Sequence, residues 1–77
     1  MIELFILEGC GYCRKVLEYL DEHNIPYTEI DISERPNEDM LIKLGGKRQV
    51  PFLVDKENKV QMYESNDIIN YFKNHII

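Results

Sequence analysis

The amino-acid sequence predicts an α/β fold in which a four-stranded mixed sheet has helices on its faces. In the first two thirds of the chain, strand-like apolar or alternating segments take turns with segments whose apolar residues recur at helical spacing. Nearer the C-terminus, two strand-like segments follow each other across a short polar turn, which indicates a β-hairpin. A final helical pattern completes the order β-α-β-α-β-β-α.

The first half of the chain predicts a strand–helix–strand unit. Residues 2–7 are apolar apart from one glutamate, as in a central strand buried on both faces. Residues 11–23 have apolar side chains at helical spacing and charged ones on the other faces, and Asn24 can stop this helix. Residues 27–32 alternate with period two and form the next strand. The two strands should be parallel, joined by a right-handed crossover.

The second predicted helix is short. Either Ser33 or Asn37 is expected to cap its N-terminus, and Gly45-Gly46 to end it. Its short apolar stripe, which should face the sheet, consists of Met40, Leu41 and Leu44.

The last third of the chain predicts a hairpin followed by a helix. Residues 52–54 and 60–63 form the two strands of the hairpin, with a polar turn at residues 55–58. Ser65 is expected to be the N-cap of the last helix, where Asp67 suits the positive end of the helix dipole. The apolar stripe of that helix consists of Ile68, Ile69, Phe72 and Ile76.

Length and composition indicate one small globular domain, residues 1–77. The net charge is −5, and no long basic run or mixture of aromatic and basic residues occurs, so nucleic acid is not an expected partner. The short apolar segment at the N-terminus has no preceding basic residues, so it is neither a signal peptide nor a membrane span. We therefore expect a monomeric cytoplasmic protein that does not bind a membrane.

The chemical signal in the sequence is Cys10-Gly11-Tyr12-Cys13, which contains both cysteines of the chain. It stands where a strand gives way to a helix, and a helix N-terminus stabilises a thiolate, the nucleophile of disulfide exchange. A structural disulfide is disfavoured because so short a loop removes little entropy from the unfolded chain. A zinc site is disfavoured because only His23 and His75 remain as ligands, without metal-like spacing. No metal site is therefore predicted.

The motifs together resemble a known superfamily. A strand, Cys-x-x-Cys at a helix start and Val50-Pro51 before a third strand resemble the thioredoxin-like pattern. Within it, Cys10-Gly11-Tyr12-Cys13 and Tyr63-Glu64-Ser65-Asn66-Asp67 resemble glutaredoxins over essentially the whole chain. The resemblance implies a thiol–disulfide oxidoreductase that reduces protein disulfides and glutathione mixed disulfides. Cys10 would be its nucleophile and Cys13 its resolving thiol.

The same resemblance implies partners and a binding site. Glutathione is the expected reductant, with no permanently bound cofactor, and a reductase supplies its electrons. The residues expected to bind glutathione or the substrate are Tyr12, Val50, Pro51, Ser65, Asn66 and Asp67. Tyr12 would line the rim, and Val50, before a cis proline, would pair with an extended thiol peptide through its backbone. Ser65 to Asp67 would hold the γ-glutamyl end, although they also suit an ordinary helix start.

Departures from the glutaredoxin pattern leave alternatives open. Gly11 replaces the commoner proline, and some glutaredoxins with a small residue here hold an iron–sulfur cluster between two subunits. The chain would then be a cluster carrier or a redox-inert binding module. Glu64-Ser65 resembles a pair in glutathione transferase N-terminal domains, but no second helical domain follows, so a transferase is not expected.

A further alternative concerns the electron donor. Glu8 lies where glutaredoxins commonly carry a lysine for the glycine carboxylate of glutathione, and either Lys47 or Arg48 is a possible substitute. However, Arg48-Gln49-Val50-Pro51 also resembles the glutathione-independent redoxins. Those redoxins take electrons from thioredoxin reductase and serve ribonucleotide reductase.

Overall fold

The computed structural model describes residues 2–75 and contains the seven elements in the predicted order. They are β1 (Ile2–Ile6), α1 (Gly11–Glu22), β2 (Thr28–Asp31), α2 (Arg35–Gly45), β3 (Phe52–Asp55), β4 (Val60–Tyr63) and α3 (Ser65–His75). The strands form one sheet in the order β2-β1-β3-β4. β1 and β2 are parallel, whereas β3 is antiparallel to both β1 and β4. The predicted four-stranded mixed sheet is thus confirmed.

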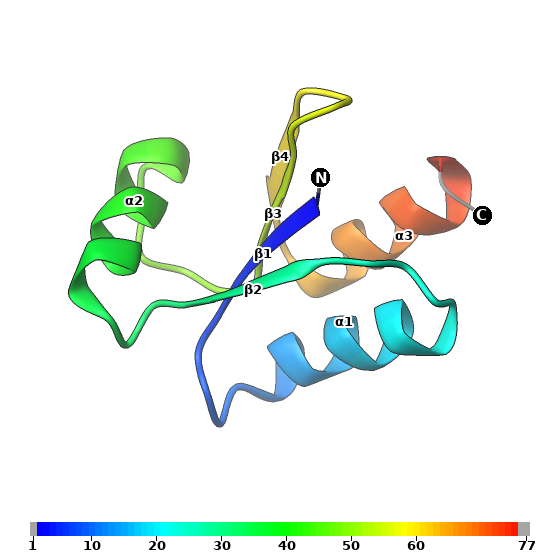
Figure 1. The fold of residues 1–77 in the computed structure, drawn as a ribbon, viewed down its shortest axis with the longest axis horizontal. Coiled ribbons are helices and arrows are strands. Elements are labelled where there is room, and N and C mark those ends of the chain that lie inside the picture. The colour runs from blue at the N-terminus through cyan, green and yellow to red at the C-terminus, as the bar shows by residue number, and fades with distance from the viewer. Residues whose placement is uncertain (1, 76–77) are drawn as a thin grey trace.

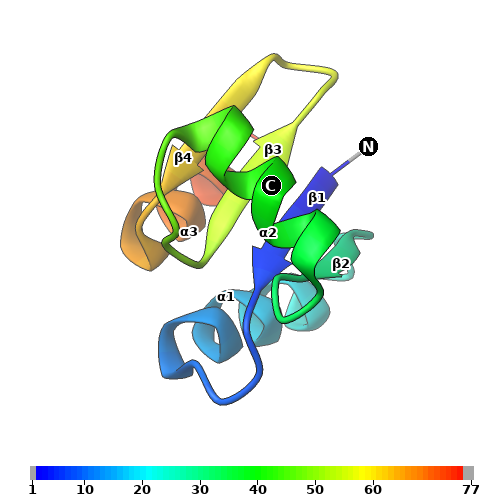
Figure 2. The ribbon, with the colours of Figure 1, turned by 90° about the vertical axis from the view of Figure 1, so that its left-hand side faces the viewer.

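Helices cover both faces of the sheet. Figure 1 shows α1 and α3 on one face and α2 on the other, and in Figure 2 α2 crosses in front of the strands. Successive residues of β1 alternate between the two cores that result, because side chains of a strand point to opposite faces. Leu4 and Ile6 belong to the larger core under α1 and α3, and Phe5 to the smaller core under α2. The prediction that this strand is buried on both faces is correct.

The apolar stripe predicted for α2 is wider than its packing face. Leu41 is buried in the smaller core, but Met40 is 43% exposed and Leu44 is 40% exposed. Met40 lies about 100° around the helix from Leu41, which turns it away from the sheet. The face of α2 that meets the sheet is therefore narrower than three residues.

The predicted N-cap of α2, either Ser33 or Asn37, is also wrong. Glu34 is the N-cap, and its side chain makes no capping hydrogen bond. Ser33 and Asn37 instead hold the preceding turn: the Ser33 N–H donates to the Asp31 carboxylate, and the Asn37 amide donates to the Asp31 carbonyl, both at 2.9 Å. At the other end, Gly46 has a φ of 92° and closes the helix, as predicted.

The N-cap of α3 lies one residue earlier in the sequence than predicted. The Glu64 carbonyl accepts the Ile68 N–H at 3.0 Å, so Ser65 is the first helical residue and not the N-cap. Glu64 has a φ of 72°, a left-handed conformation that turns the chain sharply from β4 into α3. Ile68 and Phe72 are buried as expected, Ile69 is half-buried, and Ile76 lies outside the described residues.

Candidate active site

Cys10 is the N-cap of α1. Its backbone is extended, with φ −84° and ψ 114°, and its Sγ accepts the Cys13 N–H at 3.3 Å. The sulfur thus takes the place that a serine or aspartate oxygen usually fills at this position. Gly9, with a φ of 88°, makes the turn from β1 into the helix, and the Cys10 N–H donates to the Leu7 carbonyl at 3.1 Å. Positive helix charge and an N–H group therefore face the Cys10 sulfur.

Cys13 occupies a different environment one turn into the helix. Its side chain is only 2% exposed, whereas Cys10 is half-buried. Burial raises the pKa of the Cys13 thiol to about 12, and its hydrogen bond with Cys10 acts in the same direction. Both cysteines are free thiols. Tyr12 lies between them in the sequence and is 69% exposed.

The Val50-Pro51 peptide bond is cis, which confirms the geometry expected from the resemblance. Val50 is half-buried and Pro51 is buried at the start of β3. A groove of about 570 Å³ runs past this bond. It is lined by Tyr12, Gln49, Val50, Pro51, Glu64, Ser65 and Asn66. We call it the cis-proline groove.

The cis-proline groove brings together five of the six residues predicted to bind glutathione or substrate. They come from three separate elements: the start of α1, the loop before β3 and the start of α3. Asp67, the sixth, lies in the first turn of α3 and is exposed, but it is not among the described residues that line the groove.

Two hydrogen bonds join the walls of this groove. The Lys15 ammonium donates to the Asn66 side-chain oxygen at 2.8 Å, which ties α1 to the start of α3. The Gln49 amide donates to the Glu64 carboxylate at 2.8 Å, which ties the loop before the cis proline to the same helix start. Sequence reasoning did not predict the contact of Lys15 with Asn66, because the two residues are 51 positions apart. Gln49 and Glu64 stood in the motifs but had no assigned role.

Lys47 and Arg48, the possible substitutes for a lysine near Cys10, are engaged elsewhere. Arg48 pairs with Glu38 on α2, and the Lys47 ammonium lies 4.8 Å from the centre of the Tyr63 ring. The Tyr63 hydroxyl donates to the Lys47 carbonyl at 2.8 Å. Neither cation lines the groove or the cavity beside the cysteines.

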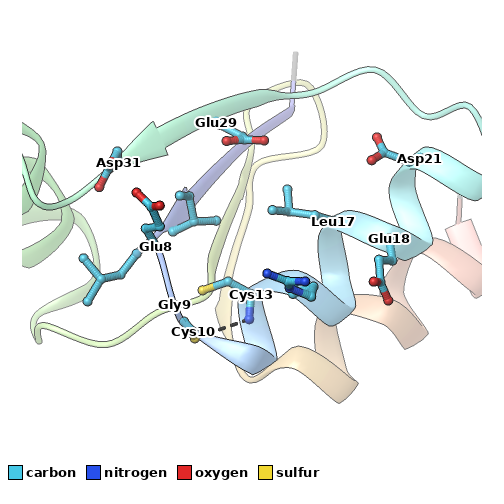
Figure 3. A pocket seen from close by; sticks show the side chains of 12 residues that line it. Glu8, Gly9, Cys10, Cys13, Leu17, Glu18, Asp21, Glu29 and Asp31 are labelled. Atoms are coloured by element: carbon cyan, nitrogen blue, oxygen red, sulfur yellow. Dashed lines mark hydrogen bonds between the residues drawn. The ribbon is translucent and has the colours of Figure 1, made fainter.

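A second cavity, of about 450 Å³, opens on the other side of the thiols. Cys10 and Cys13 both line it, whereas neither lines the cis-proline groove. Five carboxylates and one guanidinium surround it: Glu8, Glu18, Asp21, Glu29, Asp31 and Arg14. Figure 3 shows Glu8, Glu29 and Asp31 on the strand side and Glu18 and Asp21 on α1. We call it the acidic cavity.

Among these carboxylates, sequence reasoning gave only Glu8 a possible role at the site. A signal was present, since Glu18 and Asp21 are three residues apart on a helix and Glu29 and Asp31 are two apart on a strand. Each spacing places a pair on one face. That the two faces meet depends on the packing of α1 beneath the parallel β1–β2 pair.

A metal site and a membrane-spanning helix are both absent from the described residues. Between residues 2 and 75, no group of three cysteine, histidine, aspartate or glutamate side chains is arranged to hold a metal ion. In the same part of the chain, no helix has the length and apolar character needed to cross a bilayer.

Comparisons with known proteins relate the chain to a family and to individual relatives. Residues 4–75 match the family described as glutathione S-transferase, N-terminal domain. Glutaredoxin 1 of Rickettsia felis is 40% identical over 53 residues, covering 65% of this chain and 52% of that protein. Prostaglandin E synthase 2 of Mus musculus is 31% identical over 78 residues, covering 99% of this chain and 20% of that protein.

A solved structure agrees with these relatives. Glutaredoxin 2 from Salmonella typhimurium, crystallised in complex with glutathione, has a TM-score of 0.81 and 27% identity over 96% of this chain and 33% of that one. The chain thus spans 52% of the rickettsial relative and 20% of the mouse relative. The predicted thioredoxin-like fold and the resemblance to glutaredoxins are confirmed. Since the match over residues 4–75 takes in nearly all of the sequence, the chain belongs to the glutathione S-transferase N-terminal domain family.

Proposed function

We propose that this chain is a glutathione-dependent thiol–disulfide oxidoreductase that works through a reversible Cys10–Cys13 disulfide. One observation carries the proposal: the Cys10 sulfur sits at the N-cap of α1, with the Cys13 thiol buried one turn behind it. The N-cap position of Cys10 stabilises a nucleophilic thiolate. The buried Cys13 thiol lies within the same helix turn, where it can later attack the Cys10 sulfur. The glutaredoxin relatives support a redox role, since their names describe such proteins.

The proposed reaction begins at Cys10. Its thiolate attacks one sulfur of a substrate disulfide, the other substrate sulfur leaves as a thiolate, and solvent supplies that sulfur with a proton. Cys13 then loses its proton and attacks the Cys10 sulfur. The second substrate thiol departs, and the protein holds a Cys10–Cys13 disulfide. In the alternative branch, glutathione attacks the mixed disulfide at Cys10. Two glutathione molecules return the oxidised protein to its dithiol form and become one glutathione disulfide.

The cis-proline groove is the proposed glutathione site. The first N–H groups of α3 would donate hydrogen bonds to the γ-glutamyl carboxylate, because the first N–H groups of a helix lack partners within it. Asp67 would pair with the ligand's amino group, and the Val50 backbone would form strand-like hydrogen bonds with the peptide. The meeting of Tyr12, Val50 and Ser65 in one groove supports this assignment.

A second candidate function has the same thiol chemistry but a different electron donor and a different substrate. Glu8 stands where a lysine would help to bind glutathione, and Lys47 and Arg48 are both engaged elsewhere. These observations favour a redoxin reduced by thioredoxin reductase, with ribonucleotide reductase as a substrate. For either function we propose a monomer that works in the cytoplasm.

The experiment compares the two donors directly. Oxidised protein is added to NADPH and glutathione with glutathione reductase in one cuvette, and to NADPH with thioredoxin reductase in another. NADPH consumption only in the first assigns the glutathione-dependent function, and consumption only in the second assigns the alternative. The Cys10→Ser variant is the control and should consume none. If the oxidised wild-type protein is reduced in neither cuvette, the proposed function is wrong.

A further inference from the structure

The acidic cavity indicates which disulfides the protein prefers. We propose that this cavity receives a Lys- or Arg-bearing segment of the substrate, so that peptide disulfides flanked by basic residues react fastest at Cys10. The inference rests on the proposed oxidoreductase function and goes beyond it by naming the chemistry of the substrate.

The acidic cavity lies directly beside the two thiols. Cys10 and Cys13 both line it, while the cis-proline groove on the other side contains neither sulfur-bearing residue. A substrate disulfide that reaches the Cys10 sulfur has chain on both sides of the reacting bond. One side can follow the groove as an extended strand, and the other then enters the acidic cavity. The carboxylates are therefore placed where the substrate itself must pass.

The residues that line the acidic cavity carry a negative net charge. Arg14 is the single cation among its lining residues, against five carboxylates. Within residues 2–75, the side chains of Glu8, Glu18 and Glu29 make no hydrogen bond or ion pair. The other two carboxylates accept from neutral donors only. Asp21 accepts the Tyr27 hydroxyl at 2.8 Å, and Asp31 accepts the Ser33 N–H at 2.9 Å.

The negative charge of the acidic cavity should affect which substrates bind there. Clefts lined by charge of one sign raise the local concentration and the association rate of ligands of opposite sign. A basic flank would gain from the unpaired carboxylates, whereas an acidic flank would be repelled and would leave like charges close together. Glu8 adjoins the Gly9-Cys10 turn, so it acts closest to the reacting sulfur. The expected order of rates is basic, then neutral, then acidic.

The test uses three synthetic peptides of equal length, each with one intramolecular disulfide. The flanking residues are Arg in the first peptide, Ser in the second and Glu in the third. Reduced full-length protein is mixed with each, the reaction is quenched by alkylation, and peptide dithiol is counted by mass spectrometry. At low salt we expect the Arg peptide to react about tenfold faster than the Ser peptide. At about 1 M salt, where the Debye length is about 3 Å, the two rates should converge.

Matched variants locate the effect in the cavity. The Glu8→Gln/Glu29→Gln double variant should bring the Arg-to-Ser rate ratio at low salt to about threefold or less, since much of the steering charge is gone. The Glu22→Gln/Asp39→Asn double variant changes the net charge equally at exposed positions outside the cavity, and it should keep the wild-type ratio. Equal rates for all three peptides, or a ratio that survives in the cavity variant, would overturn the inference. Failure of every peptide to be reduced would instead refute the oxidoreductase function itself.

Discussion

The two ends of the sheet differ in whether their polar groups are paired within the fold. At one end, β1 runs out toward Cys10, Phe52 of β3 pairs with Phe5, and Tyr63 of β4 pairs with Phe52. The two cysteines, the cis proline and the start of α3 therefore gather there. At the other end, Asp55 pairs with Ile2 on one side and with Val60 on the other. We call these the thiol end and the Asp55 end.

At the Asp55 end, the polar groups satisfy one another. Asp55 is 2% exposed, and its carboxylate accepts the Tyr71 hydroxyl at 2.6 Å and the Asn58 amide at 2.8 Å. Burial alone would raise the pKa of Asp55, but the hydrogen bonds from Asn58 and Tyr71 outweigh it and hold the pKa below its usual value. Burial and then the neighbouring Asp55 raise the pKa of Tyr71. The result is a closed cluster that joins the β3–β4 turn to α3.

At the thiol end, polar groups remain available. Glu8 and Glu29 make no hydrogen bond or ion pair within residues 2–75, and Tyr12 is exposed. Groups already paired inside a fold stabilise it, whereas groups left at a helix start or beside a thiol can bind a ligand. We therefore expect the chemistry of the protein at the thiol end. Substitutions at the thiol end should therefore change reactivity, and substitutions at the Asp55 end should change stability.

The largest expected effect is at the thiol end. Cys10→Ser should lower disulfide reduction by at least about 1,000-fold, because the nucleophile is removed. Cys13→Ser should still remove glutathione from glutathionylated peptides, because glutathione can attack the mixed disulfide at Cys10. The Cys10→Ser variant should unfold at nearly the wild-type urea midpoint, because a serine oxygen can also cap α1. Mass spectrometry of the mixed disulfide trapped in Cys13→Ser provides the readout. Full activity of Cys10→Ser would contradict the proposed function.

The second prediction uses the buried thiol. With a pKa of about 12, Cys13 is almost entirely protonated near neutral pH, so its thiolate fraction rises with pH. Closure of the Cys10–Cys13 disulfide should therefore accelerate about tenfold for each pH unit between about pH 6 and about pH 8. Rapid-quench release of a small thiol from the Cys10 mixed disulfide measures this step. A plateau within that range would show that burial does not govern Cys13 after the mixed disulfide has formed.

Local patterns were sufficient for much of this molecule. The element order and the placement of Cys10 at a helix start follow from periodicity and turn residues, which depend on residues close together in the sequence. The cis Val50-Pro51 bond is expected from the resemblance to glutaredoxins over the whole chain. The catalytic roles of the two cysteines stay a prediction.

Features that depend on packing escaped sequence reasoning. Whether Met40 faces the sheet depends on the angle at which α2 meets it, and the helix start at Glu34 depends on how Asp31 closes the preceding turn. The contact between Lys15 and Asn66 joins residues that only the fold brings together. The acidic cavity likewise requires α1 to lie beneath β2. These are relations between elements, and periodicity describes each element alone.

The third prediction moves to the Asp55 end. Asp55→Ala should lower the free energy of unfolding by about 2–3 kcal/mol. The substitution removes the carboxylate that accepts hydrogen bonds from Tyr71 and Asn58, and it leaves Asn58 without its buried acceptor. Glu3→Gln is the matched control at the same end, since the Glu3–Lys56 pair at 3.4 Å is largely exposed on the Lys56 side. It should cost less than about 0.5 kcal/mol. Urea unfolding measures both, and equal losses would mean that burial of the carboxylate is not what matters.

A smaller effect than that of Asp55→Ala is expected for Tyr71→Phe, which removes the tyrosine hydroxyl that donates to the Asp55 carboxylate. At neutral pH the variant should lose about 1–1.5 kcal/mol of unfolding free energy. Because the folded pKa of Asp55 is lowered, the stabilisation linked to its charge is fully present above the ordinary carboxyl pKa of about 4. It is lost as the pH falls through the folded pKa.

The free energy of unfolding of Tyr71→Phe should therefore approach that of the wild type at acidic pH. Without the Tyr71 hydroxyl, the Asp55 pKa in the folded state moves back toward its ordinary value, so the variant has less charge-linked stability to lose. Urea unfolding at about pH 7 and about pH 3 should show a gap that narrows at the lower pH. A gap that stays constant would place the contribution of Tyr71 in packing alone. Unchanged peptide reduction by the same variant would show that the two ends of the sheet act independently, since Tyr71 contacts neither cysteine's cavity nor the cis-proline groove.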